Sequence, residues 1–172
     1  MLEGGSLVCN SELGVGTEFV FSFDAAYAMK AEESKSFELD VEVLKGKRVL
    51  LVEDNDLNRE IAIDMLTDIG LICEEATDGA VAVDMISKSE PGYYDIVFMD
   101  IQMPYMDGYQ ATREIRMLEN EDLAHVPIIA MTANAFEEDK RKALDAQMNA
   151  HLGKPIDLDE IIIAVKDVLK LR

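Results

Sequence analysis

Short apolar runs and amphipathic stretches alternate along most of the chain. From Lys47 onward, five apolar runs each precede a stretch of helical length in which apolar residues recur every three or four positions. The runs are RVLLVE, LICEEA, DIVFMD, VPIIAMT and NAHLG, and the helical stretches begin near Asp56, Asp78, Asp107, Asn134 and Asp157. Strands that alternate with helices are typical of βα units and a parallel sheet. This part of the chain is therefore predicted to be an α/β domain.

Each predicted helix has a capping residue and an apolar face. An Asp or Asn stands at every predicted start, where its side chain can accept hydrogen bonds from free backbone N–H groups. Two rows at helical spacing are predicted to pack in the core: Ile61, Met65 and Ile69, and Ile162, Val165 and Leu169. Right-handed crossovers would place helices on both faces of the sheet, which makes the sheet doubly wound.

The first part of the chain has a different pattern. Residues 1–23 contain two short strands, SLVCNSE and TEFVFSF, joined by a turn in which Gly14 and Gly16 permit positive φ angles. Residues 24–46 carry mixed charge and few large apolar side chains, which is typical of a linker. The predicted organisation is thus a β-hairpin over 1–23, a linker over 24–46 and the α/β domain over 47–172.

Composition excludes several classes of partner. The 172 residues include 35 acidic and 16 basic side chains, a net charge of -19, which repels nucleic acid phosphates and anionic membrane surfaces. No apolar stretch approaches the roughly 18 residues of a membrane span, so no direct membrane contact is expected for this stretch of chain. Cys9 and Cys73 are too few and too far apart for a disulfide framework, which favours the reducing cytoplasm.

Three acidic residues follow apolar runs directly. Glu53 and Asp54 close the first predicted strand, and Asp100 closes the third. In a sheet of order 2-1-3-4-5 these strands are neighbours, and their carboxyl ends form the crevice where ligands bind. Carboxylates a few ångströms apart repel one another unless a cation lies between them. Because Mg²⁺ prefers oxygen ligands, the sequence predicts a magnesium site in this crevice.

Thr132 and Lys154 are expected in the same crevice, because they close the fourth strand and follow the fifth. Taken singly, the threonine fits a turn and the lysine a solvated surface. An Asp carboxylate can attack phosphorus to form an aspartyl phosphate, a reaction that needs positioning and charge neutralisation. Asp100 is the candidate nucleophile, since it stands alone on its strand end.

Four segments together carry a resemblance to a known family. LLVEDNDLNREIA, IVFMDIQMPYMDGYQATREIR, PIIAMTANA and HLGKPID, in this order, resemble the receiver domain of two-component response regulators. The resemblance covers residues 47–172 and implies a flavodoxin-like (βα)5 fold with strand order 2-1-3-4-5. It also implies that Asp100 accepts a phosphoryl group from a phosphohistidine on a kinase or on a histidine phosphotransfer domain.

The same resemblance implies the roles of the other site residues. The implied Mg²⁺ site is made by Glu53 acting through water, Asp54, Asp100 and the backbone carbonyl of Gln102. Thr132 would turn its hydroxyl toward the phosphoryl group, and Lys154 would pair with it. The family commonly has Asp where this chain has Glu53, and Tyr or Phe where it has His151, the residue expected to switch with Thr132. A cis Lys154–Pro155 bond is a further expectation of this kind. A homodimer is a separate candidate for the assembly of the chain.

The N-terminal segment resembles a second family. LEGGSLVCNSELGVGTEFVFSF is similar to the final stretch of a histidine kinase ATP-binding domain. A kinase tail, a linker and a receiver in this order are typical of a hybrid histidine kinase. The chain would then be the C-terminal fragment of a sensor histidine kinase, and it would act as a phosphoacceptor without the kinase core. Membrane anchoring of the parent kinase is left open.

Two other functions are open to the same residues. A phosphatase of the haloacid dehalogenase type also uses an Asp nucleophile at a strand end, but it needs a second Asp two residues later. This chain has Gln102 there, which cannot transfer a proton. A receiver that binds its partner without phosphorylation is the other alternative, and the presence of Asp100, Thr132 and Lys154 together argues against it.

Overall fold

The chain forms two compact units, residues 1–33 and 34–172. The computed structural model describes residues 5–12, 14, 16–23, 41–133 and 137–171. In the first unit, β1 (Gly5–Glu12) pairs with β2 (Gly16–Phe23) as an antiparallel hairpin, so the predicted hairpin is confirmed. Most of the predicted linker, residues 24–40, lies outside the described residues.

The second unit contains a five-stranded parallel sheet. Its strands are β3 (Arg48–Val52), β4 (Ile72–Ala76), β5 (Ile96–Asp100), β6 (Ile128–Thr132) and β7 (Ala150–Gly153). The spatial order β4-β3-β5-β6-β7 is the predicted order 2-1-3-4-5. The flavodoxin-like doubly wound fold is therefore confirmed.

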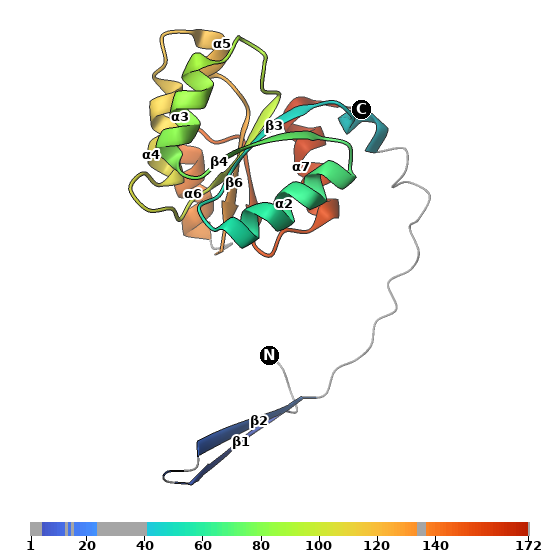
Figure 1. The fold of residues 1–172 in the computed structure, drawn as a ribbon, viewed down its shortest axis with the longest axis vertical. Helices are drawn as coiled ribbons and strands as arrows, with labels where there is room; N and C mark the ends of the chain where they lie inside the picture. Colours follow the sequence, from blue (N-terminus) through green and yellow to red (C-terminus); the bar gives the residue numbers. More distant parts are fainter. Residues whose placement is uncertain (1–4, 13, 15, 24–40, 134–136, 172) are drawn as a thin grey trace. The chain divides into compact units, whose positions relative to one another are not determined.

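Helices cover both faces of this sheet (Figure 1). They are α2 (Asp56–Asp68), α3 (Gly79–Lys88), α4 (Gly108–Arg116), the short α5 (Glu121–Ala124), α6 (Glu137–Asp145) and α7 (Leu158–Leu169). Figure 1 shows α2 and α7 on one face and α3, α4 and α6 on the other. Helix α5 was not predicted, and Asn134, the predicted start of α6, lies outside the described residues.

Side-chain caps fix the helix starts, as the sequence predicts. Asn55, Asp78, Asp107 and Asp157 each accept a hydrogen bond from a backbone N–H in the first turn of α2, α3, α4 and α7. Such caps stabilise a helix by about 1 kcal/mol each. Each cap lies in the loop that follows a strand, so it fixes where that loop ends and the helix begins.

The central strands of the sheet are buried on both faces. Successive residues of β3 and β5 point to opposite sides, so Leu50 and Val97 pack with α3 and α4 while Leu51 and Phe98 pack with α2 and α7. All four side chains are at most 1% exposed. Strands buried on both sides consist of continuous apolar runs, which explains the pattern of the sequence.

The predicted core rows need one correction. Ile69, Ile162 and Val165 are buried, but Ile61 is 51% exposed. Helix α2 instead turns Ala62 and Leu66 toward the sheet. One residue corresponds to about 100° on a helix, so the inward-facing row is the one that begins a single position later.

The segment just before β3 belongs to the core of the second unit. Residues Glu42–Leu44 form a short 3-10 helix, η1, and Leu44 is fully buried in the cluster beneath α2 and α7. The predicted boundary near Gly46 had placed this leucine in the linker. Among the residues that the structure describes, no helix combines the length and the apolar character needed to cross a membrane.

Candidate functional site

Three carboxylates meet at the carboxyl edge of the sheet. Glu53 and Asp54 follow β3, and Asp100 is the last residue of β5. Because β3 pairs with β5 so that Val52 lies opposite Met99, the residues after this pair are neighbours across the two strands. One oxygen of each acid lies within 4.8 Å of one oxygen of each of the others. The predicted meeting of the three acids is confirmed.

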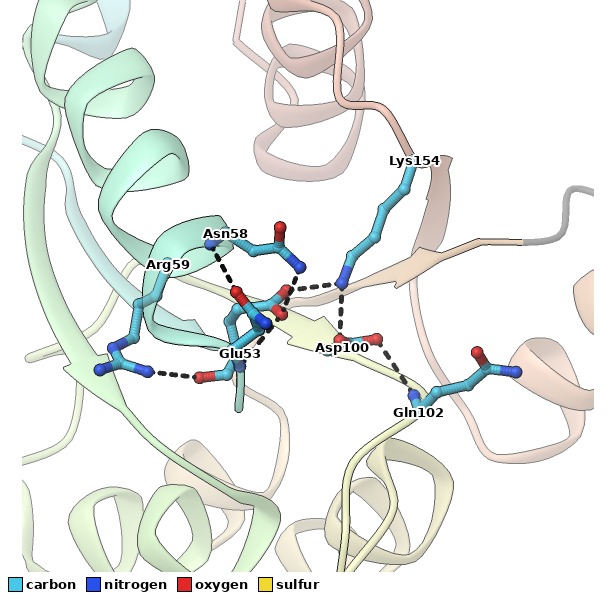
Figure 2. A network of polar contacts seen from close by, with 7 residues as sticks. Glu53, Asn58, Arg59, Asp100, Gln102 and Lys154 are labelled. Carbon is cyan, nitrogen blue, oxygen red and sulfur yellow. Dashed lines mark hydrogen bonds and ion pairs between the residues drawn. The ribbon is translucent and has the colours of Figure 1, made fainter. Parts of the chain in front are cut away.

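Lys154 lies between two of these acids (Figure 2). Its Nζ donates to Glu53 Oε2 at 2.5 Å and to Asp100 Oδ2 at 2.6 Å. The Lys154–Pro155 peptide bond is cis, as the resemblance implied. The Lys154 backbone N–H donates to the carbonyl of Thr132 at 2.7 Å, which ties the loop after β7 to the end of β6.

Thr132 and Gln102 complete the surroundings of Asp100. Thr132 ends β6, the strand next to β5, and is 5% exposed. The backbone N–H of Gln102 donates to Asp100 Oδ1 at 3.0 Å, while its side chain points away from the acid (Figure 2). Both oxygens of Asp100 are thus held by donors, one from its own loop and one from Lys154. The ligand role of the Gln102 carbonyl stays a prediction.

The site holds more negative than positive charge. Burial raises the pKa of Asp100, hydrogen bonds from Lys154 and the Gln102 backbone oppose the rise, and the charge of Glu53 adds to it. Burial lowers the pKa of Lys154, but its bonds to Asp100 and Glu53 outweigh this effect and raise the pKa overall. Burial is thus the main cause of the raised pKa of Asp100, and the two acidic partners are the cause of the raised pKa of Lys154. The exposed Asp54 leaves this group open to a divalent cation, and an all-oxygen set of this kind fits Mg²⁺.

Two residues of α2 that were not predicted as site residues contact Glu53. Asn58 Nδ2 donates to Glu53 Oε1 at 3.1 Å, and Arg59 donates from Nη1 to the Glu53 carbonyl at 3.0 Å (Figure 2). Arg59 also binds Asp56 and Glu75 through its other nitrogens. The sequence does contain a signal for Asn58. This residue lies three positions after the capping Asn55, and a polar side chain at that position can form a hydrogen bond with residues just before the helix.

Gly108 lies against the backbone of Asp100. Its φ lies outside the left-handed region, so backbone strain is not the reason for a glycine at this position. A Cβ on Gly108 would instead lie 2.2 Å from the carbonyl oxygen of Asp100. The glycine is needed for space, and the positive φ in this loop belongs to Tyr105.

His151 lies apart from the acids. It is half-buried on β7, opposite Ala130 of β6, and it lines the grooves between this strand and helices α6 and α7. The structure therefore brings together Glu53, Asp54, Asp100, Gln102, Thr132 and Lys154, while the switch role of His151 stays a prediction.

Comparison with known proteins agrees with this geometry. Residues 49–166 match the family model of the response regulator receiver domain. "Probable histidine kinase 2" of Oryza sativa subsp. indica is 46% identical over 138 residues, which cover 74% of this chain. "Hybrid signal transduction histidine kinase L" of Dictyostelium discoideum is 40% identical over 158 residues, which cover 91% of this chain. The chain spans 13% and 9% of the length of these two relatives.

Two solved structures have a similar fold. The receiver domain of sensor histidine kinase PA1611 from Pseudomonas aeruginosa PAO1, with a magnesium ion coordinated in its active site cleft, has a TM-score of 0.65 at 38% identity and covers 73% of this chain and 98% of its own. A chain in the co-crystal structure of the Saccharomyces cerevisiae histidine phosphotransfer protein Ypd1 with the receiver domain of Ssk1 has a TM-score of 0.66 at 30% identity, covering 74% and 92%.

Proposed function

Because the chain belongs to the response regulator receiver domain family, we propose that Asp100 is its phosphoacceptor and that Glu53, Asp54, Thr132 and Lys154 serve the transfer. Receiver domains of hybrid histidine kinases are phosphoacceptors in two-component phosphorelays. The observation that carries the residue assignment is the position of the Lys154 ammonium, 2.6 Å from Asp100 at the edge where the three acids meet. A nucleophile, a cation and an open acidic cluster then lie within one crevice.

In the proposed reaction a carboxylate oxygen of Asp100 forms a bond to phosphorus while the bond from phosphorus to the donor breaks. The donor nitrogen or oxygen leaves with the bonding electron pair, and the product is an aspartyl phosphate. Lys154 is placed to pair with the phosphoryl oxygens, and the Thr132 hydroxyl to donate to them. A Mg²⁺ ion held by Asp54, Asp100 and the Gln102 carbonyl would neutralise further charge on the same oxygens.

Acetyl phosphate, a small phosphodonor, tests this function without a partner protein. In the presence of Mg²⁺ the chain is expected to gain the mass of one phosphoryl group, measured on the intact protein by mass spectrometry. Adding EDTA before the donor is expected to slow the gain strongly, because Lys154 alone cannot balance the charges of the acids and the phosphoryl group. A folded chain that gains no mass with Mg²⁺ would contradict the proposal.

The proposed donor is a phosphohistidine on a kinase or on a histidine phosphotransfer domain. Asp100 is 4% exposed, so a donor histidine must enter from the rim of the crevice and its domain must contact the surface around it. On the α2 side this rim is apolar, since Leu57 and Ile61 are 63% and 51% exposed. A groove of about 410 Å³ runs from Ile61 past Glu53 and Lys154 to Pro155. We place the donor domain on this side.

Ile61→Glu tests the docking surface. Introducing a charge into an apolar contact is expected to slow transfer from a phosphorylated histidine phosphotransfer protein roughly tenfold or more, as loss of a central apolar contact costs about 1–2 kcal/mol. Phosphorylation by acetyl phosphate, which needs no docking, is expected to keep its wild-type rate. Leu144→Glu is the control, because Leu144 is 68% exposed on α6, away from the groove. Equal loss in both variants would contradict the docking site.

The rest of the proposal concerns the parent protein. We propose that residues 1–23 end a histidine kinase ATP-binding domain, that 24–46 link it to the receiver at 47–172, and that the whole is a hybrid sensor histidine kinase. In support, Leu7 and Phe19 of the hairpin are each 59% exposed, and a two-stranded sheet needs a packing partner. Both cysteines are free, which supports the proposed cytoplasmic location.

The output of the receiver belongs to the proposal as well. Phosphorylation of Asp100 would draw the Thr132 hydroxyl toward the new phosphoryl group and change the packing of β7, where His151 lies between α6 and α7. A second copy of the chain is a candidate partner for this face.

A further inference from the structure

Asn58 is held at both its backbone and its side chain. It lies in the first turn of α2, where its N–H donates to the side chain of the capping Asn55 at 3.0 Å. Its own amide donates to Glu53 Oε1 at 3.1 Å (Figure 2). The first turn of the helix thereby connects directly to one of the three acids.

Both oxygens of the Glu53 carboxylate accept hydrogen bonds from protein donors. Oε1 accepts from Asn58 and, at 3.4 Å, from the backbone N–H of Asn55, while Oε2 accepts from Lys154. The residue is 2% exposed. Asp54, in contrast, is exposed at the mouth of the site. The two adjacent acids therefore have different surroundings, one facing the lysine and one facing solvent.

We infer that Asn58 is a positioning residue that keeps Glu53 turned toward Lys154, so that Glu53 anchors the lysine while Asp54 and Asp100 are left to bind the metal ion. Glutamate has one more rotatable bond than aspartate, and it can therefore swing toward a cation unless a neighbour holds it. The Asn58 amide holds the carboxylate end, and Arg59 holds the backbone end at the Glu53 carbonyl. The inference rests on the proposed function, because it concerns the same crevice.

The test is Mg²⁺ binding measured by isothermal titration calorimetry, with no phosphodonor present. Asn58→Ala removes the donor to Glu53 Oε1 and lets this oxygen turn to the metal ion. The Mg²⁺ dissociation constant is expected to fall roughly three- to tenfold, because the released bond is a charge-assisted one. In a Glu53→Gln background the same substitution is expected to have no effect, since the group through which Asn58 acts has lost its charge.

Gln110→Ala is the matched control. Gln110 also donates its side-chain amide to a glutamate, Glu114, at 3.0 Å, but both residues lie on α4. The control is expected to leave Mg²⁺ affinity unchanged. In EDTA, Asn58→Ala is expected to lower the melting temperature more than Gln110→Ala, because Glu53 is buried and Glu114 is half-buried.

Three results would overturn the inference: an unchanged Mg²⁺ affinity in Asn58→Ala, a weaker one, or a change that persists in the Glu53→Gln background. A weaker affinity would mean that Asn58 supports Glu53 as a metal ligand. The phosphorylation of the wild-type chain by acetyl phosphate separates this inference from the proposed function. If the wild-type chain is phosphorylated and the calorimetry fails, the phosphoacceptor function stands and only the role of Asn58 falls.

Discussion

Asp100→Asn is expected to abolish phosphorylation by acetyl phosphate. The amide oxygen that replaces the carboxylate is a far poorer nucleophile. Neither neighbouring acid is expected to replace it, because Glu53 is bonded to Lys154 and Asp54 is a proposed Mg²⁺ ligand. The fold is expected to survive. Burial disfavours the charged form of Asp100 and raises its pKa, and the Asn side chain has the same shape without the charge. Intact-protein mass spectrometry after incubation with acetyl phosphate and Mg²⁺ checks the first expectation, and circular dichroism checks the second.

Asp84→Asn is the control for this loss. Asp84 is an exposed acid on α3 that pairs with Lys88, so its substitution also removes one carboxylate from the surface. It is expected to keep the full mass gain. A phosphoryl group that still appears on Asp100→Asn at the wild-type rate, or that maps to another residue in the wild-type chain, would refute the assignment of the phosphoacceptor.

Gly108→Ala is expected to destabilise the domain by about 2–3 kcal/mol and to slow phosphorylation. At the first position of α4, alanine would by itself favour the helix by up to about 1 kcal/mol. The new Cβ would meet the Asp100 carbonyl oxygen at 2.2 Å, and this atom belongs to the backbone of β5, a central strand with a paired neighbour on each side. Either β5 or α4 must move, and Asp100 moves with the strand. Urea denaturation gives the free energy of unfolding, and the acetyl phosphate reaction gives the rate.

Gly92→Ala separates lack of space from backbone strain. Gly92 has a φ of +76° and open space around its Cα, so alanine there is expected to cost about 1–2 kcal/mol from strain alone. Phosphorylation is expected to stay at the wild-type rate. If Gly108→Ala proves as stable as the wild type, the close approach of α4 to β5 does not restrict the residue at this position.

The pattern of apolar residues predicts the sheet well, because strands buried on both faces must be continuous apolar runs between polar turns. The central strands β3, β5 and β6 are runs of this kind, and all five strands form where the sequence predicts them. The order β4-β3-β5-β6-β7 agrees with the order that the family resemblance implies. The same pattern predicts less well which side of a helix is buried. Helix α2 is exposed on one side, and apolar residues lie on both its exposed and its buried sides. Ile61 looked like a core residue for this reason, although it lies at the rim of the site.

What the sequence by itself determined is the identity of the chemical groups and their common edge. Acids, a threonine and a lysine follow the strands of a parallel sheet, and the carboxyl ends of parallel strands must lie together. What only the tertiary structure decided is which of these groups form hydrogen bonds with one another. A hydrogen bond needs its atoms placed to within a few tenths of an ångström, and the spacing of residues in the sequence does not encode such positions. Lys154 bridges Glu53 and Asp100, and Asn58 reaches back from α2 to hold Glu53 in that bridge.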